Sequence, residues 1–174
     1  MAVSRILQSL SSGGEESDDE LLHGATRLAI PEDDDTITTV VDLLDTKTHH
    51  RSLCVGLAAP QIGSNLRIAI VQHGEDDIVM INPEIISTSG KKDTKRESCM
   101  SIWGMVGPVE RRDKVEVSFI DGEGIEHLEK YTGFTARIVQ HELDHLDGVL
   151  FDQRANDRLA ATDIFEGRTP ASPE

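Results

Sequence analysis

The stretch Gln140-His-Glu-Leu-Asp-His-Leu-Asp-Gly148 decides how the rest of this sequence is interpreted. It places His141 and His145 four residues apart with Glu142 between them, and residues with that spacing share one face of an α-helix. Two imidazoles on one face can bind one metal ion, while Glu142 is rotated by about 100° and lies beside the ion. That is the position of a base acting on water at a metal. The stretch therefore predicts a metal-binding helix.

Apolar residues in and before this stretch support a helix, because Phe134 and Ile138 are four residues apart, as are Val139 and Leu143. The alternative is an exposed helix whose two histidines share a face by chance, since short motifs do produce false matches. A catalytic metal site also needs a third protein ligand, which two histidines do not supply.

Cys99 is the best candidate for that ligand. It stands in the segment Glu97-Ser-Cys-Met-Ser101, between the predicted strand pairs and outside any recognisable core pattern. One thiolate and two imidazoles suit a divalent transition metal and leave one coordination position open for water. The alternative is a buried structural cysteine, which is a common role. The histidine motif decides in favour of a ligand.

The composition limits the class of protein. A chain of 174 residues can form one domain with its own core, and with 37% hydrophobic but only 3% aromatic residues that core must be aliphatic. The net charge of −15 argues against a nucleic-acid or anionic-membrane partner. Two cysteines make no disulfide framework, and no secretory signal or membrane-spanning run is visible. We therefore expect a soluble cytoplasmic protein.

The spacing of apolar and turn residues predicts the order of elements. In chain order these are a helix over 36–50, strands over 67–71 and 78–82 with Pro83 closing the second, a strand over 115–120, a turn at 121–124, a returning strand over 124–130, and the histidine helix, ended by Gly148. This order predicts an α+β fold with a mostly antiparallel sheet.

A further segment, Gly56-Leu-Ala-Ala-Pro-Gln-Ile-Gly63, has the composition of a binding loop. Its two glycines and small residues allow the backbone to approach a ligand closely, and Gln61 adds an amide donor. Taken alone, the segment would be an ordinary turn between a helix and a strand.

Together the three segments resemble the signature motifs of the peptide deformylase family. They occur in the family's order as Cys54-Val-Gly-Leu-Ala-Ala-Pro-Gln61, Glu97-Ser-Cys-Met-Ser101 and Gln140-His-Glu-Leu-Asp-His145. The resemblance runs from about Gly24 to Phe151. Three ordered motifs are far more specific than any one of them.

The resemblance implies a sheet packed around a C-terminal metal-binding helix, and a defined reaction. The reaction is removal of the formyl group from the N-terminal methionine of new polypeptides by water activated at a metal ion. It assigns the metal ligands to Cys99, His141 and His145, with Fe²⁺ as the expected ion and Zn²⁺ or Ni²⁺ as alternatives. The partners it implies are the N-formylmethionyl peptide and, transiently, the ribosome. We expect a monomer with no membrane and no specific nucleic-acid partner.

The resemblance also assigns the remaining site residues. Glu142 is the catalytic carboxylate, and the formyl oxygen is held by the Gln61 side chain and the backbone N–H of Met100. The substrate backbone is expected to run beside three residues, Val55, Gly56 and Ser98.

The sequence divides into three parts. Residues 1–20 predict an acidic, flexible N-terminal segment, because Ser11 to Glu20 contains only Ser, Gly, Glu and Asp. Residues 21–152 form the peptide-deformylase-like catalytic domain. Residues 153–174 form a polar C-terminal tail.

Several positions depart from the family motifs. Cys54 and Ser98 stand where the family has glycine, and Met100 stands where it has leucine. Trp103 and Val106 replace a proline and an arginine. We expect Cys54 to add a side chain beside the substrate backbone.

These departures keep two other functions open. One is a deformylase-fold hydrolase that acts on another N-formyl or amide substrate. The other is a non-catalytic metal-binding module that uses its acidic first 35 residues as a contact. Intact ligand and base residues argue against the second.

Overall fold

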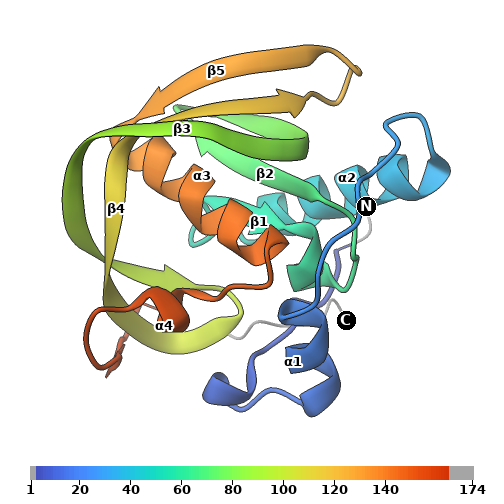
Figure 1. Cartoon of the computed structure of the whole chain (residues 1–174). Helices are drawn as coiled ribbons and strands as arrows, with labels where there is room; N and C mark the ends of the chain where they lie inside the picture. Colours follow the sequence, from blue (N-terminus) through green and yellow to red (C-terminus); the bar gives the residue numbers. More distant parts are fainter. Residues whose placement is uncertain (1–2, 165–174) are drawn as a thin grey trace.

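The structure, a computed structural model that describes residues 3–164, has an α+β fold in which a curved antiparallel sheet surrounds one helix (Figure 1). Neighbouring strands pair in the order β1-β2-β3-β4-β5, and β6 pairs with β4. The strands are β1 (Gly56–Ala58), β2 (Ile68–His73), β3 (Asp76–Cys99), β4 (Ile102–Ile120), β5 (Glu126–Thr132) and β6 (Ala160–Ala161). The predicted fold class is confirmed.

Within residues 3–164, three helices precede β1, one lies between β1 and β2, and two follow β5. They are the 3₁₀ helix η1 (Leu10–Ser12), α1 (Glu16–Leu22), α2 (Asp34–His49), the 3₁₀ helix η2 (Ala59–Ile62), α3 (Gly133–Leu146) and α4 (Phe151–Arg154). The predicted helices over 36–50 and around the histidines correspond to α2 and α3. In α2, Asp34 and Asp35 occupy the first turn and Lys47 and His49 the last, which is the charge order that the helix dipole favours.

The strand β3 does not end at Pro83, as the sequence predicted. Its pairing with β4 shifts between Ile81 and Glu84, which is a bulge that removes the proline from the ladder. Asn82 adopts a positive φ of 53° there. Its side chain accepts a 2.8 Å hydrogen bond from the Ala29 N–H and donates one of 2.8 Å to the Ala29 carbonyl. The bulge therefore lets the strand continue to Cys99.

α3 packs across the concave face of the sheet (Figure 1). Its buried apolar residues join those of β1, β2, β4 and β5 in one cluster, which includes Ala58, Ala69, Val71, Val117, Phe119, Tyr131, Ile138, Val139, Leu143 and Leu146. Gly148 ends the helix with φ 72°, and the N–H groups of Gly148 and Val149 bond to the carbonyls of His145 and Asp144. A side chain at Gly148 would also meet the His23 carbonyl oxygen at 2.6 Å.

The acidic N-terminal segment has more structure than the flexible loop that its composition predicted. Residues Glu16–Leu22 form α1, and Asp18 is only 3% exposed. Its carboxylate accepts bonds of 2.8 and 2.6 Å from the Arg5 guanidinium. Ile6 and Leu7 are buried in the core. The division of the chain at residue 20 stays a prediction.

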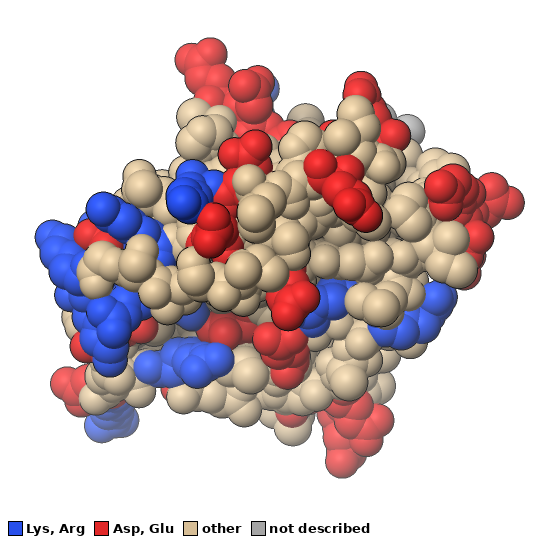
Figure 2. Space-filling model, turned by 45° about the horizontal axis from the view of Figure 1, so that its top comes forward, with Lys and Arg blue, Asp and Glu red and all other residues tan. Residues whose placement is uncertain are grey.

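Charge is distributed unevenly over the surface. Figure 2 shows Lys and Arg side chains gathered at one side of the visible face and acidic side chains over much of the rest. Four exposed basic residues lie close together in the sequence of β3, Lys91 and Lys92 before Asp93-Thr94 and Lys95 and Arg96 after it. The net charge of −15 is therefore not spread evenly, because one side of the visible face is rich in Lys and Arg.

The C-terminal part continues the fold for a short distance. α4 packs against β4, and β6 pairs with β4 through Met105 and Val106. Residues 165–174 of the predicted tail lie outside the described residues. Within residues 3–164, no helix is both long and apolar enough to cross a membrane.

Candidate metal centre and active site

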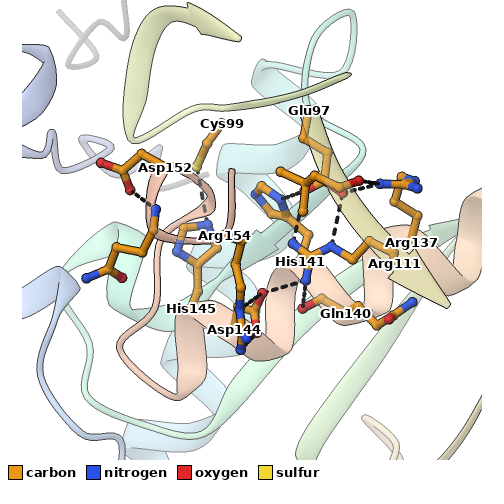
Figure 3. Close-up of polar contacts among 12 residues, drawn as sticks. Glu97, Cys99, Arg111, Arg137, Gln140, His141, Asp144, His145, Asp152 and Arg154 are labelled. Atoms are coloured by element: carbon orange, nitrogen blue, oxygen red, sulfur yellow. Dashed lines mark hydrogen bonds and ion pairs between the residues drawn. The ribbon is translucent and has the colours of Figure 1, made fainter. Parts of the chain in front are cut away.

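The fold brings the three predicted metal ligands together. Cys99 is the last residue of β3, while His141 and His145 lie on α3 (Figure 3). One potential ligand atom from each lies within 4.8 Å of the other two, and the Cys99 Sγ is 3.2 Å from the His145 Nε2. A tetrahedral ion with bonds of about 2.0–2.3 Å holds its ligand atoms roughly 3–4 Å apart. The cluster therefore fits one divalent ion of the kind that thiolate and imidazole prefer.

Glu142 lies beside this cluster, as the helical spacing predicted. It is 3% exposed, and its Oε2 has no hydrogen-bond partner within residues 3–164. Burial raises the pKa of Glu142 to about 7. A Cβ at Gly56 would lie 2.4 Å from its Oε1, so only glycine leaves room for the carboxylate against β1.

The two histidines occupy different electrostatic environments. Burial lowers the pKa of His145, and the charge of His141 lowers it further. Burial also opposes protonation of His141, but hydrogen bonds with Cys99 and Glu97 outweigh it and raise the pKa of His141 well above its usual value. The Nδ1 of His141 lies 3.0 Å from the Glu97 Oε2, so the other ring nitrogen of His141, Nε2, is the one that can bind a metal ion.

Glu97 is a site residue that had no role among the sequence-based predictions. It is 6% exposed and also accepts bonds of 3.0 and 2.9 Å from Arg111 and of 2.6 Å from Arg137. Burial would raise the pKa of Glu97, but its bonds with His141 and Arg111 hold it well below its usual value. Glu97 and Cys99 are two residues apart in a strand, and that alternation was the signal that both face the metal helix.

A line of alternating charges continues from Glu97 along α3 (Figure 3). Arg111 reaches from Glu97 to Asp144, whose Oδ2 lies 2.5 Å from the arginine Nη1. Arg154 of α4 donates a 2.8 Å bond to the other oxygen of Asp144. Arg111 is 7% exposed and Asp144 8%, so these ions are withdrawn from water and depend on one another.

Gln61 approaches the cluster from η2. Its Oε1 accepts a 2.9 Å hydrogen bond from the Ala58 N–H, which turns the Nε2 toward Cys99 and Ser101. That Nε2 lies 3.6 Å from the Cys99 Sγ and 3.2 Å from the Ser101 Oγ. Met100 and Ser101 form the two-residue turn between β3 and β4. The structure thus brings Gln61 and Met100, the two predicted oxyanion donors, to the same cysteine.

The residues predicted to contact substrate lie around this centre. Val55 and Ser98 are half-buried and Gly56 is buried. Ser98 also lines an open cleft of about 1000 Å³ together with Arg96, Trp103, Gly104, Val106, Ala161, Thr162, Asp163 and Ile164. Three of the sequence departures, Ser98, Trp103 and Val106, therefore meet in one cleft.

Cys54 does not crowd the substrate region, contrary to the expectation from sequence. Its side chain is 1% exposed and packs in a core cluster with Ile6, Leu57 and Met100. The Cys54 Sγ lies 3.1 Å from the Gly56 carbonyl oxygen, and burial raises the pKa of the Cys54 thiol above its usual range. The side chain turns inward because it fills apolar space behind β1.

Known proteins share both this sequence and this fold. A family model described as polypeptide deformylase matches residues 15–160. The peptide deformylase of Desulforudis audaxviator is 48% identical over 116 residues, covering 66% of this chain and 74% of its own. That of Natranaerobius thermophilus is 38% identical over 142 residues, covering 81% and 90%.

Solved structures agree with the sequence comparison. The peptide deformylase of Synechococcus elongatus, in complex with actinonin, has a TM-score of 0.78 at 34% identity and covers 91% of this chain and 82% of its own. That of Thermotoga maritima has a TM-score of 0.78 at 29% identity, covering 90% and 100%. The fold, with one cysteine and two histidines beside a buried carboxylate, defines a metal-dependent hydrolase. The chain belongs to the peptide deformylase family.

Proposed function

We propose that this chain removes the N-formyl group from the N-terminal methionine of newly made polypeptides, with Cys99, His141 and His145 as ligands of one divalent ion. The observation that carries the proposal is the close approach of these three side chains beside a buried carboxylate. Fe²⁺ is the ion we expect, and Zn²⁺ or Ni²⁺ suit the same ligands. The proposal includes a monomeric protein that binds the ribosome transiently.

Glu142 moves the proton in this reaction. A divalent ion held by Cys99, His141 and His145 would supply the Lewis acidity that makes water easier to deprotonate near neutral pH. The Glu142 carboxylate, held beside the ligands and close to Gly56, accepts a proton from the attacking water and returns it to the leaving amine. No acyl-enzyme is needed, because the Cys99 sulfur is committed to the ion.

Gln61 and Met100 stabilise the charge that develops on the formyl oxygen. The Gln61 Nε2 is oriented in advance by the bond from the Ala58 N–H to its Oε1. The Met100 N–H belongs to the peptide that follows the Cys99 ligand, so it lies next to the reacting carbon. Donors that are fixed before reaction stabilise an oxyanion more than mobile ones, because no reorganisation is needed.

The substrate backbone runs beside Val55, Gly56 and Ser98. Gly56 belongs to β1, the outer strand at one end of the sheet order, and an extended peptide can bind beside such a strand. The cleft next to Ser98 lies one residue from Cys99 and is open to side chains that follow the formyl-methionine.

The decisive test is Glu142→Gln, assayed with formyl-Met-Ala after metal analysis. The side chain is not a ligand, so the variant should keep one ion and should still bind actinonin, which a related structure contains. Loss of a general base typically costs about 10²–10⁴-fold, so we expect kcat to fall at least a hundredfold with KM little changed. An active, metal-loaded variant would exclude the carboxylate role.

A second candidate function is hydrolysis of another N-formyl compound. Ser98, Trp103 and Val106, three departures from the family motifs, favour it because all three line the same cleft. Comparison of kcat/KM for formyl-Met-Ala with that for N-formyl compounds lacking methionine distinguishes the two functions. A preference for the latter would replace the proposed substrate and leave the metal chemistry intact.

A further inference from the structure

The segment from Leu7 to Ser12 contacts the back of the candidate oxyanion site. The Leu7 N–H donates to the Gln61 carbonyl at 2.8 Å, and the Ser9 N–H donates to the Ser101 carbonyl at 2.8 Å. Between them, the Gln8 Nε2 donates to the Met100 carbonyl at 2.8 Å. Three consecutive residues therefore connect the two loops that carry the proposed donors.

The turn at Met100 and Ser101 needs these contacts. Met100 is 5% exposed and Ser101 0%, so this two-residue turn is buried, whereas most turns run over the surface. Buried carbonyl groups require hydrogen-bond partners. Gln8 supplies the partner for Met100, and Ser9, with the Ser12 hydroxyl at 3.3 Å, supplies the partners for Ser101.

The Gln8 bond also fixes the orientation of a peptide plane. The carbonyl of the Met100–Ser101 peptide accepts from Gln8, while the N–H of the same peptide lies 3.4 Å from the Cys99 Sγ. With this plane held at both ends, and with Cys99 held as a ligand, little freedom remains for the Met100 N–H between them. Its direction is then set before substrate binds.

The acidic residues of α1 hold this segment in place. Asp18 accepts from Arg5 and, at 3.3 Å, from the Gln8 N–H. Asp19 accepts from the Ser9 hydroxyl and from the Leu10 N–H, both at 2.9 Å. Ile6 packs in the cluster that contains Met100, and Leu7 packs in the one that contains Cys99.

We propose that Gln8 is a positioning residue, which orients the Met100 N–H toward the formyl oxygen through its bond to the Met100 carbonyl. This inference rests on the proposed deformylase function. The segment from Leu7 to Ser9 thereby acts on the transition state without touching the substrate. Its effect is confined to kcat, because a misdirected donor weakens oxyanion binding more than ground-state binding.

Gln8→Met tests the proposal, since it keeps the length of the side chain and removes its N–H donors. Loss of one oxyanion donor costs about 10²–10³-fold, and its misorientation should cost less, so we expect kcat for formyl-Met-Ala to fall about tenfold. KM and metal content should stay within twofold. Gln8→Lys, which restores a donor of similar reach, should recover most of the activity. If Gln8→Met does not fold, Gln8→Glu replaces it as the test variant, because it keeps the shape of the side chain and lacks its N–H donors.

Gln72→Met is the matched control. The Gln72 side chain is also half-buried and also donates to a backbone carbonyl, that of Gly74 at 3.1 Å, in the turn between β2 and β3. We expect its kcat to match that of the unmodified protein. Equal losses in the Gln8 and Gln72 variants, or a loss of metal in Gln8→Met, would assign Gln8 a structural role only.

Amide hydrogen exchange supplies a readout that does not depend on turnover. In Gln8→Met the amides of Met100 and Ser101 should exchange at least tenfold faster, and in Gln72→Met they should not change. Unaltered exchange and unaltered kcat would overturn the positioning role while the unmodified protein still hydrolyses formyl-Met-Ala. An unmodified protein that fails to hydrolyse it would instead overturn the proposed function, and the exchange result would still decide whether Gln8 holds the turn.

Discussion

Glu97 and Gln61 both serve the cluster around Cys99, but the groups that hold them differ in charge. Glu97 accepts from the cations Arg111 and Arg137 and from a histidine ligand, all of them buried or nearly so. Gln61 is a neutral amide that accepts two backbone hydrogen bonds, one from the Ala58 N–H to its side chain and one from the Leu7 N–H to its carbonyl. The proposed metal side of the site is therefore organised by charge, and the proposed oxyanion side by neutral donors.

This difference predicts which properties a substitution on each side should change. A buried ion that loses its partner keeps its full desolvation penalty, whereas a neutral hydrogen bond contributes about 1 kcal/mol net. Substitutions on the Glu97 side should therefore affect stability and metal binding together. Substitutions on the Gln61 side should leave both nearly intact and affect the rate.

The largest effect on stability is expected for Arg111→Met. The substitution removes the guanidinium that lies between Glu97 and Asp144, and so leaves two buried carboxylates short of a partner. Breaking a buried ion pair costs about 3–5 kcal/mol, and we expect a loss of that size in the free energy of unfolding measured with urea. Arg112→Met is the control, because the Arg112 guanidinium bonds to the Gly90 carbonyl in an exposed position. Similar losses in both variants would contradict the charged organisation of this side.

A smaller effect is expected for Cys54→Gly, because Cys54 belongs to the apolar packing behind β1 and to neither set of polar contacts. The buried sulfur fills space in the cluster with Leu57 and Met100, so its removal leaves a cavity and adds the backbone freedom of glycine. We expect a loss of about 2 kcal/mol in the free energy of unfolding, with kcat/KM for formyl-Met-Ala within twofold. An increase in kcat/KM at unchanged stability would instead show that Cys54 does crowd the substrate.

The smallest effect is expected for Asp18→Asn, and it should depend on pH. The Arg5 guanidinium holds the pKa of Asp18 below its usual value, so the folded state favours the charged carboxylate. A lowered pKa stabilises the fold above the unfolded value near 4, and this contribution disappears as the pH falls through the folded pKa. We expect the variant to be about 1 kcal/mol less stable at pH 7, because the half-exposed Arg5 leaves the pair partly screened by water, and we expect the difference to disappear as the pH falls through the folded pKa of Asp18. A difference in Tm that is independent of pH would contradict the pairing.

Sequence was sufficient for the parts of the molecule where a local pattern and a chemical requirement coincide. The spacing of His141 and His145, the helix α2 and the turn before β5 were all confirmed for that reason. The long outer parts of β3 and β4 were missed, because their exposed faces are polar and a bulge at Pro83 interrupts the pattern.

Contacts between segments far apart in the chain could not be predicted from the sequence. The composition of residues 11–20 indicated a flexible loop, and nothing in it revealed that Arg5 pairs with Asp18. Glu97 belongs to one of the three motifs, yet its partners Arg111 and Arg137 come from β4 and α3 and meet it only in the folded chain. Cys54 was expected at the substrate, because a motif position does not show in which direction a side chain turns.

The bond from Gln8 to the Met100 carbonyl joins residues 92 positions apart, and this has a consequence for how the protein is made. During synthesis, Ile6 and Leu7 emerge long before the turn and the sheet that bury them. Contacts of such long sequence separation form slowly, because the chain loses conformational entropy on closing the loop before the new contacts stabilise it. The growing chain therefore exposes the apolar side chains of Ile6 and Leu7 until most of β3 has been translated, and Cys99 meets the two histidines only after α3 emerges.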